Sequence, residues 1–286
     1  MTEQLKLTLV YAICGILILL NAALIYFDVY YGLLIPVIAL ILLMAIYSLD
    51  KLFYLAVFFT PLSIILEHQD FNLGLSLPTE PLMFGIMAIF LLNAIYKRNY
   101  DSRILNHPVS LAIIFSLCWT IITCISSEMP IVSLKHFISK LWFIIPFYFL
   151  AILIFKNYNN INKFFWFYII PFAGVVVYTV VLHAGHDFGH KASHWVMDPF
   201  FNDHTSYGAI LVMFFPMFFL FFREKKYSNT VKLFTFILFL IFSIGIVLSY
   251  TRAAWLSLTF AIGVAGIYYF RVKLSTLIVM AFIGLG

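Results

Sequence analysis

Long, continuous apolar segments recur along this sequence and constrain its fold more than any other feature. A helix that crosses a bilayer needs ~20 apolar residues. Backbone polar groups inside the bilayer must pair within the chain, so only helices or a closed barrel can span it. Barrel strands would alternate polar and apolar residues, and these segments do not. We therefore predict an all-α, polytopic transmembrane bundle of about eleven helices that forms a single transmembrane domain over residues 1–286. The predicted helices cover residues 7–27, 31–47, 52–66, 81–96, 109–125, 139–155, 164–182, 206–222, 233–248, 253–270 and 274–286.

The basic residues between these segments predict an orientation. When the N-terminus is placed in the cytoplasm and the helices alternate, thirteen of the 17 lysines and arginines fall on the cytoplasmic side. The outer side then holds only Lys135, Lys140, Lys191 and Arg252. This asymmetry is typical of multi-pass membrane proteins, which keep their basic loops inside. Because the basic residues are scattered between helices instead of forming one patch, we expect no nucleic-acid partner.

Histidine has the opposite distribution. Seven of the eight histidines fall on the predicted outer side, and five of them lie between residues 183 and 204. We therefore expect the polar chemistry of the protein at the outer face, in that loop and around residue 252.

The most informative segment is Ser-Tyr-Thr-Arg-Ala-Ala-Trp, residues 249–255. Arg252 lies between two apolar helices with no acidic residue nearby in sequence, and charge within a membrane is costly and usually functional. If Ser249 or Thr251 caps the following helix, Arg252 lies at the positive end of that helix dipole. A bound phosphate would then be held by backbone N–H groups, the dipole and the guanidinium together. The alternative is an arginine that reaches the outer interface only to keep its charge in water.

Two stretches together resemble the O-antigen ligase and polymerase superfamily. One is the arginine segment at the start of a late helix. The other is Phe-Phe-Asn-Asp-His-Thr-Ser-Tyr-Gly-Ala, residues 200–209, which leads into an apolar helix containing Pro216. The close resemblance covers residues 196–270, and the remainder is similar only in helix density and topology.

This resemblance implies a glycosyltransferase of the GT-C type in the bacterial inner membrane. Such an enzyme moves a glycan from an undecaprenyl-pyrophosphate carrier to an acceptor hydroxyl on the outer, periplasmic face. The acceptor is the lipid A core in the ligases and another repeat unit in the polymerases. The resemblance implies no nucleotide sugar, no cofactor and no obligatory metal, and it makes Arg252, with Thr251 beside it, the group that binds the donor pyrophosphate.

The sequence departs from the family in two respects. The family carries a large outer loop two helices after the arginine segment, with a histidine proposed as general base, whereas this sequence stops at Gly286 before such a loop. We expect either a piece of a longer protein or a natural short form. The family also tends to have an arginine before the Asn-Asp-His stretch. Here only Lys191 is available, and lysine supplies charge without a bidentate fork.

Two further groups in the outer region have alternative interpretations. If residues 183–194 are helical, four histidines share one face and could bind zinc or supply a base, whereas the glycines at 185 and 189 favour a flexible polar loop. Asp203 either caps the next helix or orients His204, which could accept a proton from an acceptor hydroxyl. We retain Asp203 and His204 as candidate catalytic residues.

The segment 128–142 is predicted to be a short amphipathic helix at the outer interface. Its Lys135 and Lys140 either attract a pyrophosphate or reach toward water as interfacial lysines do. Two other functions remain open, a transporter or flippase for polysaccharide precursors and a non-catalytic membrane partner. A transporter typically shows internal repeats and polar residues at mid-membrane, and neither is evident in this sequence.

Overall fold

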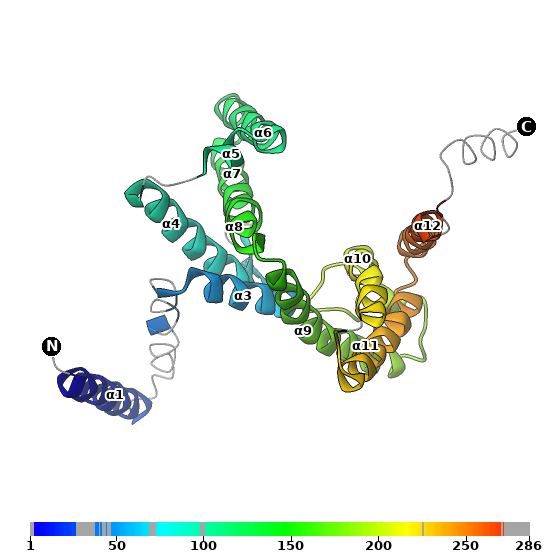
Figure 1. Cartoon of the computed structure of the whole chain (residues 1–286), viewed down its shortest axis with the longest axis horizontal. Coiled ribbons are helices and arrows are strands. Elements are labelled where there is room, and N and C mark those ends of the chain that lie inside the picture. The colour runs from blue at the N-terminus through cyan, green and yellow to red at the C-terminus, as the bar shows by residue number, and fades with distance from the viewer. Residues whose placement is uncertain are drawn as a thin grey trace, which may run out of the picture. The chain divides into compact units, whose positions relative to one another are not determined.

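The computed structural model describes residues 3–26, 38–39, 41, 44, 47–68, 73–97, 101–224, 226–269 and 271 (Figure 1). The chain divides into two compact units. Unit 1 comprises Met1–Ala56 and Glu80–Tyr158, and unit 2 comprises Val57–Thr79 and Asn159–Gly286.

Six helices of the described chain are long and apolar enough to cross a membrane, which makes the protein a helical, multi-pass membrane protein. They are Thr79–Tyr96, Pro108–Ile125, Pro130–Phe155, Asn159–Ala184, His204–Arg223 and Asn229–Leu248. The predicted helix at 7–27 overlaps α1 (Glu3–Tyr26), and the one at 253–270 overlaps α12 (Arg252–Tyr269), whose apolar stretch Arg252–Ile267 is shorter than the six candidate spans. Most of the predicted helix at 31–47 and all of that at 274–286 lie outside the described residues.

Unit 1 contains one long helical run that the sequence had predicted as two pieces. Helix α7 (Pro130–Ile144), the π-helical turn η3 (Ile145–Leu150) and α8 (Ala151–Phe155) follow one another without a break. Residues 130–142 of the helix expected at 128–142 are helical, but this helix is not short, because it continues to Phe155. The lone Pro146 does not end the helix, and the wider π turn accommodates it.

Helices α4 (Thr79–Lys97) and α6 (Pro108–Ile125) contact this run through side chains. The ring of Phe84 on α4 meets that of Trp142 edge-on at 6.1 Å, and Ser110 Oγ on α6 lies 2.9 Å from Tyr148 Oη. The fully buried Phe53 on α3 (Leu49–Phe59) packs against Phe147. Aromatic contacts thus help to hold unit 1 together.

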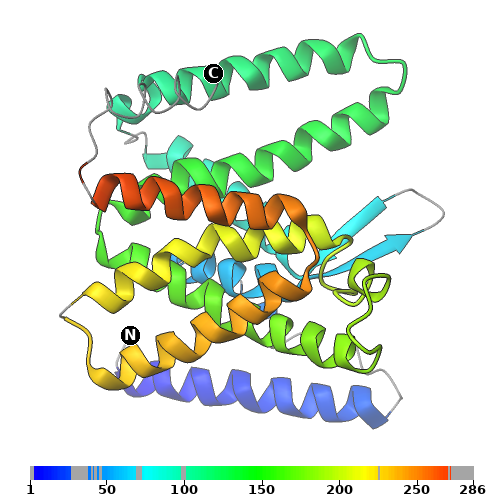
Figure 2. The same cartoon turned by 90° about the vertical axis from the view of Figure 1, so that its right-hand side faces the viewer.

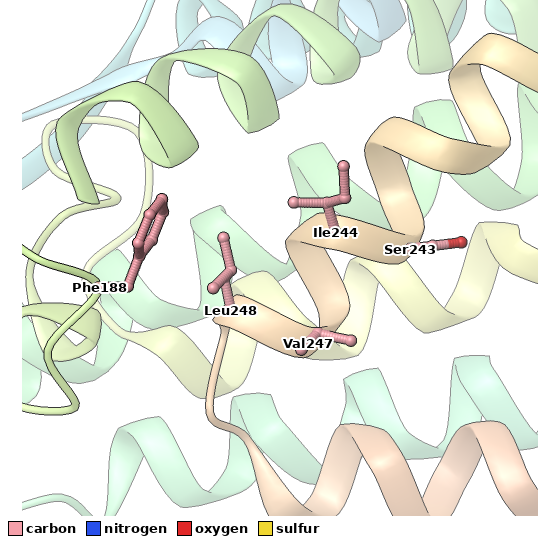
Figure 3. Close-up of a pocket in the computed structure, with 5 residues that line it drawn as sticks. All are labelled: Phe188, Ser243, Ile244, Val247 and Leu248. Atoms are coloured by element: carbon pink, nitrogen blue, oxygen red, sulfur yellow. The ribbon is translucent and has the colours of Figure 1, made fainter. Parts of the chain in front are cut away.

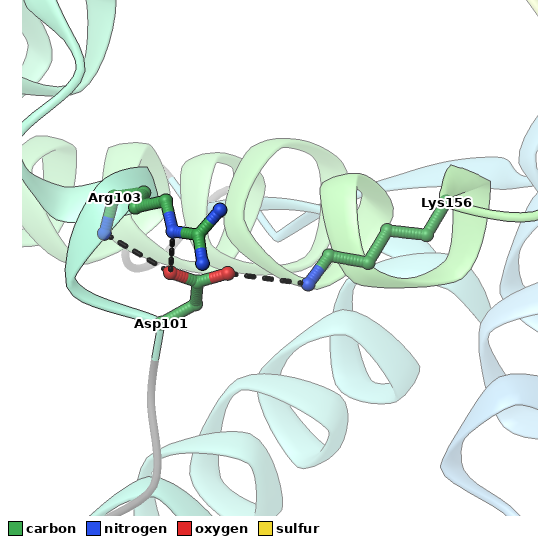
Figure 4. A network of polar contacts seen from close by, with 3 residues as sticks. All are labelled: Asp101, Arg103 and Lys156. Carbon is green, nitrogen blue, oxygen red and sulfur yellow. Dashed lines mark hydrogen bonds and ion pairs between the residues drawn. The ribbon is translucent and has the colours of Figure 1, made fainter.

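Asp101, which lies between α4 and α6, forms a small polar network with Arg103 and Lys156 (Figure 4). Asp101 caps α5 (Ser102–Leu105) by accepting from the N–H of Arg103, and its other carboxylate oxygen lies 3.5 Å from Lys156 Nζ. The Arg103 N–H and the nearby Lys156 hold the pKa of Asp101 below its ordinary value. The network is solvent-exposed, so we assign it a role in ordering the loop and little stability.

The predicted helix at 52–66 is wrong in its second half. Helix α3 stops at Phe59, a 3₁₀ turn η2 (Thr60–Leu62) follows, and the chain then forms strand β1 (Ile64–His68). Pro61 explains the break, since proline removes a backbone donor and disfavours helical geometry in the residue before it. Strand β1 pairs antiparallel with β2 (Leu73–Leu77), with Ile64 opposite Leu77.

Unit 2 contains four helices that pack side by side: α9 (Asn159–Ala184), α10 (His204–Arg223), α11 (Asn229–Leu248) and α12. Figure 2 shows α10 and α11 in yellow and orange and α12 in red. Aromatic rings fill the core between them. Phe165 stacks on Phe221 with ring centroids 4.7 Å apart, and Phe172 meets Phe242 edge-on at 5.2 Å.

The four helices alternate in direction, so each end of unit 2 gathers particular chain segments. At one end Tyr250 Oη, just after α11, donates to the carbonyl of Phe188, just after α9, and Thr251 contacts the start of α10. At the opposite end the Arg223 guanidinium lies over the ring of Tyr269, 5.8 Å from its centroid. We call the first of these the histidine end, because residues 183–204 lie there.

Candidate functional site

The start of α10 is fixed by Asp203. Its Oδ1 accepts hydrogen bonds from the backbone N–H groups of Thr205 (2.7 Å) and Ser206 (2.8 Å), and its Oδ2 accepts from Ser206 Oγ (2.8 Å). These bonds, those from Ser206 foremost, favour the carboxylate and hold the pKa of Asp203 below its ordinary value. The capping interpretation is therefore confirmed. The carboxylate forms no hydrogen bond with the His204 ring, so a catalytic role for Asp203 stays a prediction.

The start of α12 is built differently. Ser249 Oγ accepts from the N–H of Thr251 and donates to the carbonyl of Ile246, and it is buried. The carbonyl of Thr251 accepts the helical hydrogen bond of the Trp255 N–H, so Thr251 occupies the capping position. Its hydroxyl, however, faces two carbonyl oxygens, those of His204 at 2.8 Å and Ser249 at 3.1 Å. The side chain thus ties α12 to α10.

These contacts bring two helix starts together at the histidine end. Gly208, one turn into α10, allows the approach, because a Cβ atom added there would lie 3.1 Å from the Cβ atoms of Ala254 and Thr251. Both neighbouring atoms are fixed to the α12 backbone and cannot rotate away. Since the two helices are parallel, the positive ends of their dipoles lie at the same end of unit 2.

Arg252 is the first residue of α12, and its side chain is exposed. Across the described residues, no carboxylate lies within ion-pair distance of its guanidinium. A cation at the positive end of a helix, without a counter-charge, is unfavourable for the free protein. The arrangement becomes favourable when an anion binds there, since the guanidinium fork and the dipole of α12 would act on it together, whereas the carboxylate of Asp203 already occupies the start of α10.

The loop before α10 does not form the helix that would place four histidines on one face. Helix α9 ends at Ala184, turns follow, and only the 3₁₀ turn η4 (Ala192–His194) is helical thereafter. His183 is buried, with its Nε2 3.1 Å from the carbonyl of Gly189, whereas His186 is exposed and faces Trp195. The shared helical face is therefore wrong, and the alternative of a polar loop fits these turns.

Tertiary contacts nevertheless bring three histidines of this region together. His194 Nδ1 lies 3.1 Å from His204 Nδ1, and the ring of His190 lies 5.3 Å from that of His194. The His190 ring also meets that of Tyr250, two residues before Arg252, with ring centroids 5.2 Å apart. Lys191 lies in the same loop and is exposed. Four of the predicted site residues lie at the histidine end of unit 2: Lys191, His204, Thr251 and Arg252.

The backbone of this end is strained. Asp187, Phe188 and Tyr250 have φ angles of 52°, 51° and 49°, in the left-handed region that aromatic residues rarely adopt. Tyr250 Oη donates to the carbonyl of Phe188 at 3.1 Å, so the two strained aromatic residues support each other. Such strain costs of order 1–3 kcal/mol per residue and concentrates at functional sites.

Lys135 and Lys140 belong to unit 1 and lie within the helical run Pro130–Phe155, a candidate membrane span. Lys140 Nζ donates to Ser116 Oγ and Thr120 Oγ1 on α6, each at 3.1 Å. Lys140 is the eleventh residue of this run and contacts the middle of α6.

A hollow of about 350 Å³ lies beside the histidine end (Figure 3). It is lined by Phe188 of the loop and by Ser243, Ile244, Val247 and Leu248 of α11. The lining is apolar, so the hollow suits a hydrocarbon group and offers no polar contact to a charged one. In the described part of the chain, no set of three or more His, Cys, Asp or Glu side chains is arranged to hold a metal ion.

No protein-family model, curated protein or solved structure matches this chain. The resemblance described above therefore rests on the two sequence stretches alone.

Sequence reasoning missed three features of this site: the pairing of His194 with His204, the close approach at Gly208 and the strained Phe188–Tyr250 contact. The Tyr-Gly pair at 207–208, one turn into a predicted helix, was the only available signal for the close approach. The other two depend on contacts between residues 10 and 62 positions apart, which no local pattern encodes.

Proposed function

We propose that this protein is a membrane glycosyltransferase of the O-antigen ligase and polymerase type. It would move a glycan from an undecaprenyl-pyrophosphate carrier to the hydroxyl of a lipid A core or of a growing polysaccharide. The reaction would take place at the periplasmic face of the bacterial inner membrane. The observation that carries the proposal is the exposed guanidinium of Arg252, which has no carboxylate partner among the described residues and lies where the starts of α10 and α12 meet.

In this proposal Arg252 binds the diphosphate of the donor lipid. The bond between the anomeric carbon of the glycan and the diphosphate oxygen breaks, and the acceptor oxygen forms a new bond to that carbon. Negative charge develops on the departing diphosphate, and the guanidinium would stabilise it. Thr251 supports this geometry, because its hydroxyl bonds to the carbonyl of His204 at 2.8 Å and holds the two helix starts together.

The acceptor hydroxyl must lose a proton in this reaction, and His204 is our candidate to accept it. When its Nδ1–H donates to His194, its Nε2 is unprotonated and can accept the proton from the acceptor hydroxyl. Asp203 fixes the start of α10 and thereby the position of His204. Lys191 lies in the adjoining loop and would add positive charge for the donor. For Lys135 and Lys140, a contact with phosphate stays a prediction.

The proposal is tested by glycan transfer in proteoliposomes that contain an undecaprenyl-pyrophosphate oligosaccharide and an acceptor glycolipid. Arg252→Ala should reduce the transfer rate by about 10²–10³-fold, the usual effect of removing a group that stabilises transition-state charge. Arg252→Lys should also be impaired, because lysine lacks the bidentate fork.

Arg223→Ala is the matched control, since it removes a positive charge from the opposite end of unit 2, where Arg223 contacts Tyr269. It should leave transfer unchanged. Unfolding temperatures of all variants should be compared in the same lipid. Full activity of a folded Arg252→Ala protein would refute the role of Arg252 and remove the main support for this function.

A further inference from the structure

The contact between His194 and His204 pairs two imidazole nitrogens directly. The Nδ1 atoms lie 3.1 Å apart, and the rings are nearly perpendicular, at 82°. A neutral imidazole carries a hydrogen on only one nitrogen, so a hydrogen bond here needs one ring to donate through Nδ1 and the other to accept. An ion bound by both Nδ1 atoms would lie to one side of the line that joins them, so each ring would turn from its hydrogen-bonding orientation to bind it.

The separation of the two nitrogens fits metal chelation. Nitrogen ligands lie ~2.0–2.1 Å from a zinc ion. Two such ligands are therefore about 3.3–3.4 Å apart at a tetrahedral angle and about 2.9 Å apart at a right angle, which is usual for Cu²⁺. The observed 3.1 Å lies between these values. We propose that His194 and His204 form a two-imidazole site for a divalent transition-metal ion, an inference that does not rest on the proposed glycan transfer.

The two rings come from separately fixed segments, so the ion would find them already close. His194 ends the 3₁₀ turn η4, and His204 begins α10, whose start Asp203 caps. His194 is exposed, which gives an ion access from water. Because no third protein ligand is arranged at this position among the described residues, water would fill the remaining coordination positions.

Metal binding requires only a local proton shift. In the hydrogen-bonded pair, one ring carries its proton on Nδ1 and the other on Nε2. When the ion binds both Nδ1 atoms, the first ring loses its Nδ1 proton and gains one on Nε2, so no proton is released overall. Acid should reverse the binding, because protons compete with the ion for the imidazole nitrogens.

The probe is Cu²⁺, which binds nitrogen sites most tightly among the first-row divalent ions. The full chain, purified without a polyhistidine tag and held in lipid nanodiscs at neutral pH, would be titrated with Cu²⁺ and followed by electron paramagnetic resonance. We expect one site whose spectrum shows two imidazole nitrogens. His194→Ala and His204→Ala should each weaken binding by roughly tenfold or more, since one ligand is lost.

The double variant should lose less binding free energy than the sum of the two single losses, because removing one ring already ends chelation. His186→Ala is the control: this histidine lies in the same loop, but its Nδ1 contacts the carbonyl of Leu182 and its ring faces Trp195. It should leave the affinity unchanged. If His204→Ala fails to fold, the loop variant His194→Ala decides. A single coordinated nitrogen, or equal affinities of the wild-type and His194→Ala proteins, would overturn the proposal.

Discussion

Asp203 illustrates how single residues position the site, because its carboxylate accepts three hydrogen bonds from the first turn of α10. Arg252, by contrast, is left without an acidic partner among the described residues. Asp203 holds the backbone at the start of α10 in place, and the guanidinium of Arg252 is exposed. This division is typical of a binding site, where rigid supports present an unsatisfied charge.

Replacing Asp203 should separate its capping role from any catalytic one. Asp203→Ala should lower the free energy of unfolding by about 1 kcal/mol at neutral pH, because the N–H groups of Thr205 and Ser206 lose their acceptor. Asp203→Asn should retain most of that stability, since asparagine caps as well as aspartate. Unfolding in detergent micelles, followed by circular dichroism, would measure both. Loss of glycan transfer in a stable Asp203→Asn protein would indicate a role beyond capping.

The same residue should contribute to acid sensitivity. The folded-state pKa of Asp203 is lowered, so its stabilising contribution is present above the unfolded-state value of ~3.9 and is lost as the pH falls from there through the folded-state pKa. The Asp203→Asn variant has no carboxyl group to titrate at this position. Its stability should therefore fall less steeply below about pH 4 than that of the wild-type protein. Identical acid profiles would contradict this assignment.

At the scale of elements, close packing of the helices of unit 2 depends on glycine. A Cβ atom added to Gly245 on α11 would lie 2.8 Å from Val176 Cγ1, 3.1 Å from Tyr207 Oη and 3.3 Å from Leu211 Cδ1. These atoms come from α9 and α10, so Gly245 lies where three helices meet. Gly174, on α9, has no heavy atom within 4 Å of such a Cβ and faces outward.

This contrast predicts opposite effects for the same substitution. Gly245→Ala should lower the free energy of unfolding by about 1–3 kcal/mol, because the added methyl group overpacks the core. Gly174→Ala should raise it by up to about 1 kcal/mol, because alanine loses less backbone entropy in a helix. Unfolding titrations of the two variants in the same micelle would test this. A Gly245→Ala protein as stable as the wild type would show that the helices can separate slightly without cost.

Several helices could be predicted from the sequence. Long apolar segments gave the helices at 109–125, 164–182, 206–222 and 233–248 to within a few residues, because a bilayer requires a fixed helix length. Helices that contain or adjoin a proline were harder to predict. Pro61 ends a helix, whereas Pro171 and Pro216 lie inside helices that neighbouring helices support. Sequence alone does not distinguish these cases, because the difference depends on packing.

The candidate site could be predicted only where it depends on local sequence. The cap at Asp203 and the place of Arg252 at the start of a helix follow from local sequence, since capping acts over three residues. The meeting of His194 with His204 and of Tyr250 with Phe188 follows from the path of the loop between α9 and α10.

At the scale of the whole molecule, the alternation of α9 to α12 predicts which loops share a side of the membrane. Lys191 lies at the histidine end with Arg252, whereas Lys226 lies in the turn between α10 and α11, at the end where Arg223 contacts Tyr269. Both lysines are exposed. In a multi-pass protein the basic loops stay in the cytoplasm, which predicts that Lys191 is periplasmic and Lys226 cytoplasmic.

Cysteine labelling can test this arrangement in cells. In a variant without Cys14, Cys118 and Cys124, a cysteine introduced by Lys191→Cys should react with a membrane-impermeant maleimide in intact spheroplasts. One introduced by Lys226→Cys should react only after lysis, because the two loops lie at opposite ends of α10. Labelling of both in intact cells would contradict the alternation. The reverse pattern would keep the fold but place Arg252 in the cytoplasm, where a glycan carried on undecaprenyl pyrophosphate at the periplasmic face could not reach it.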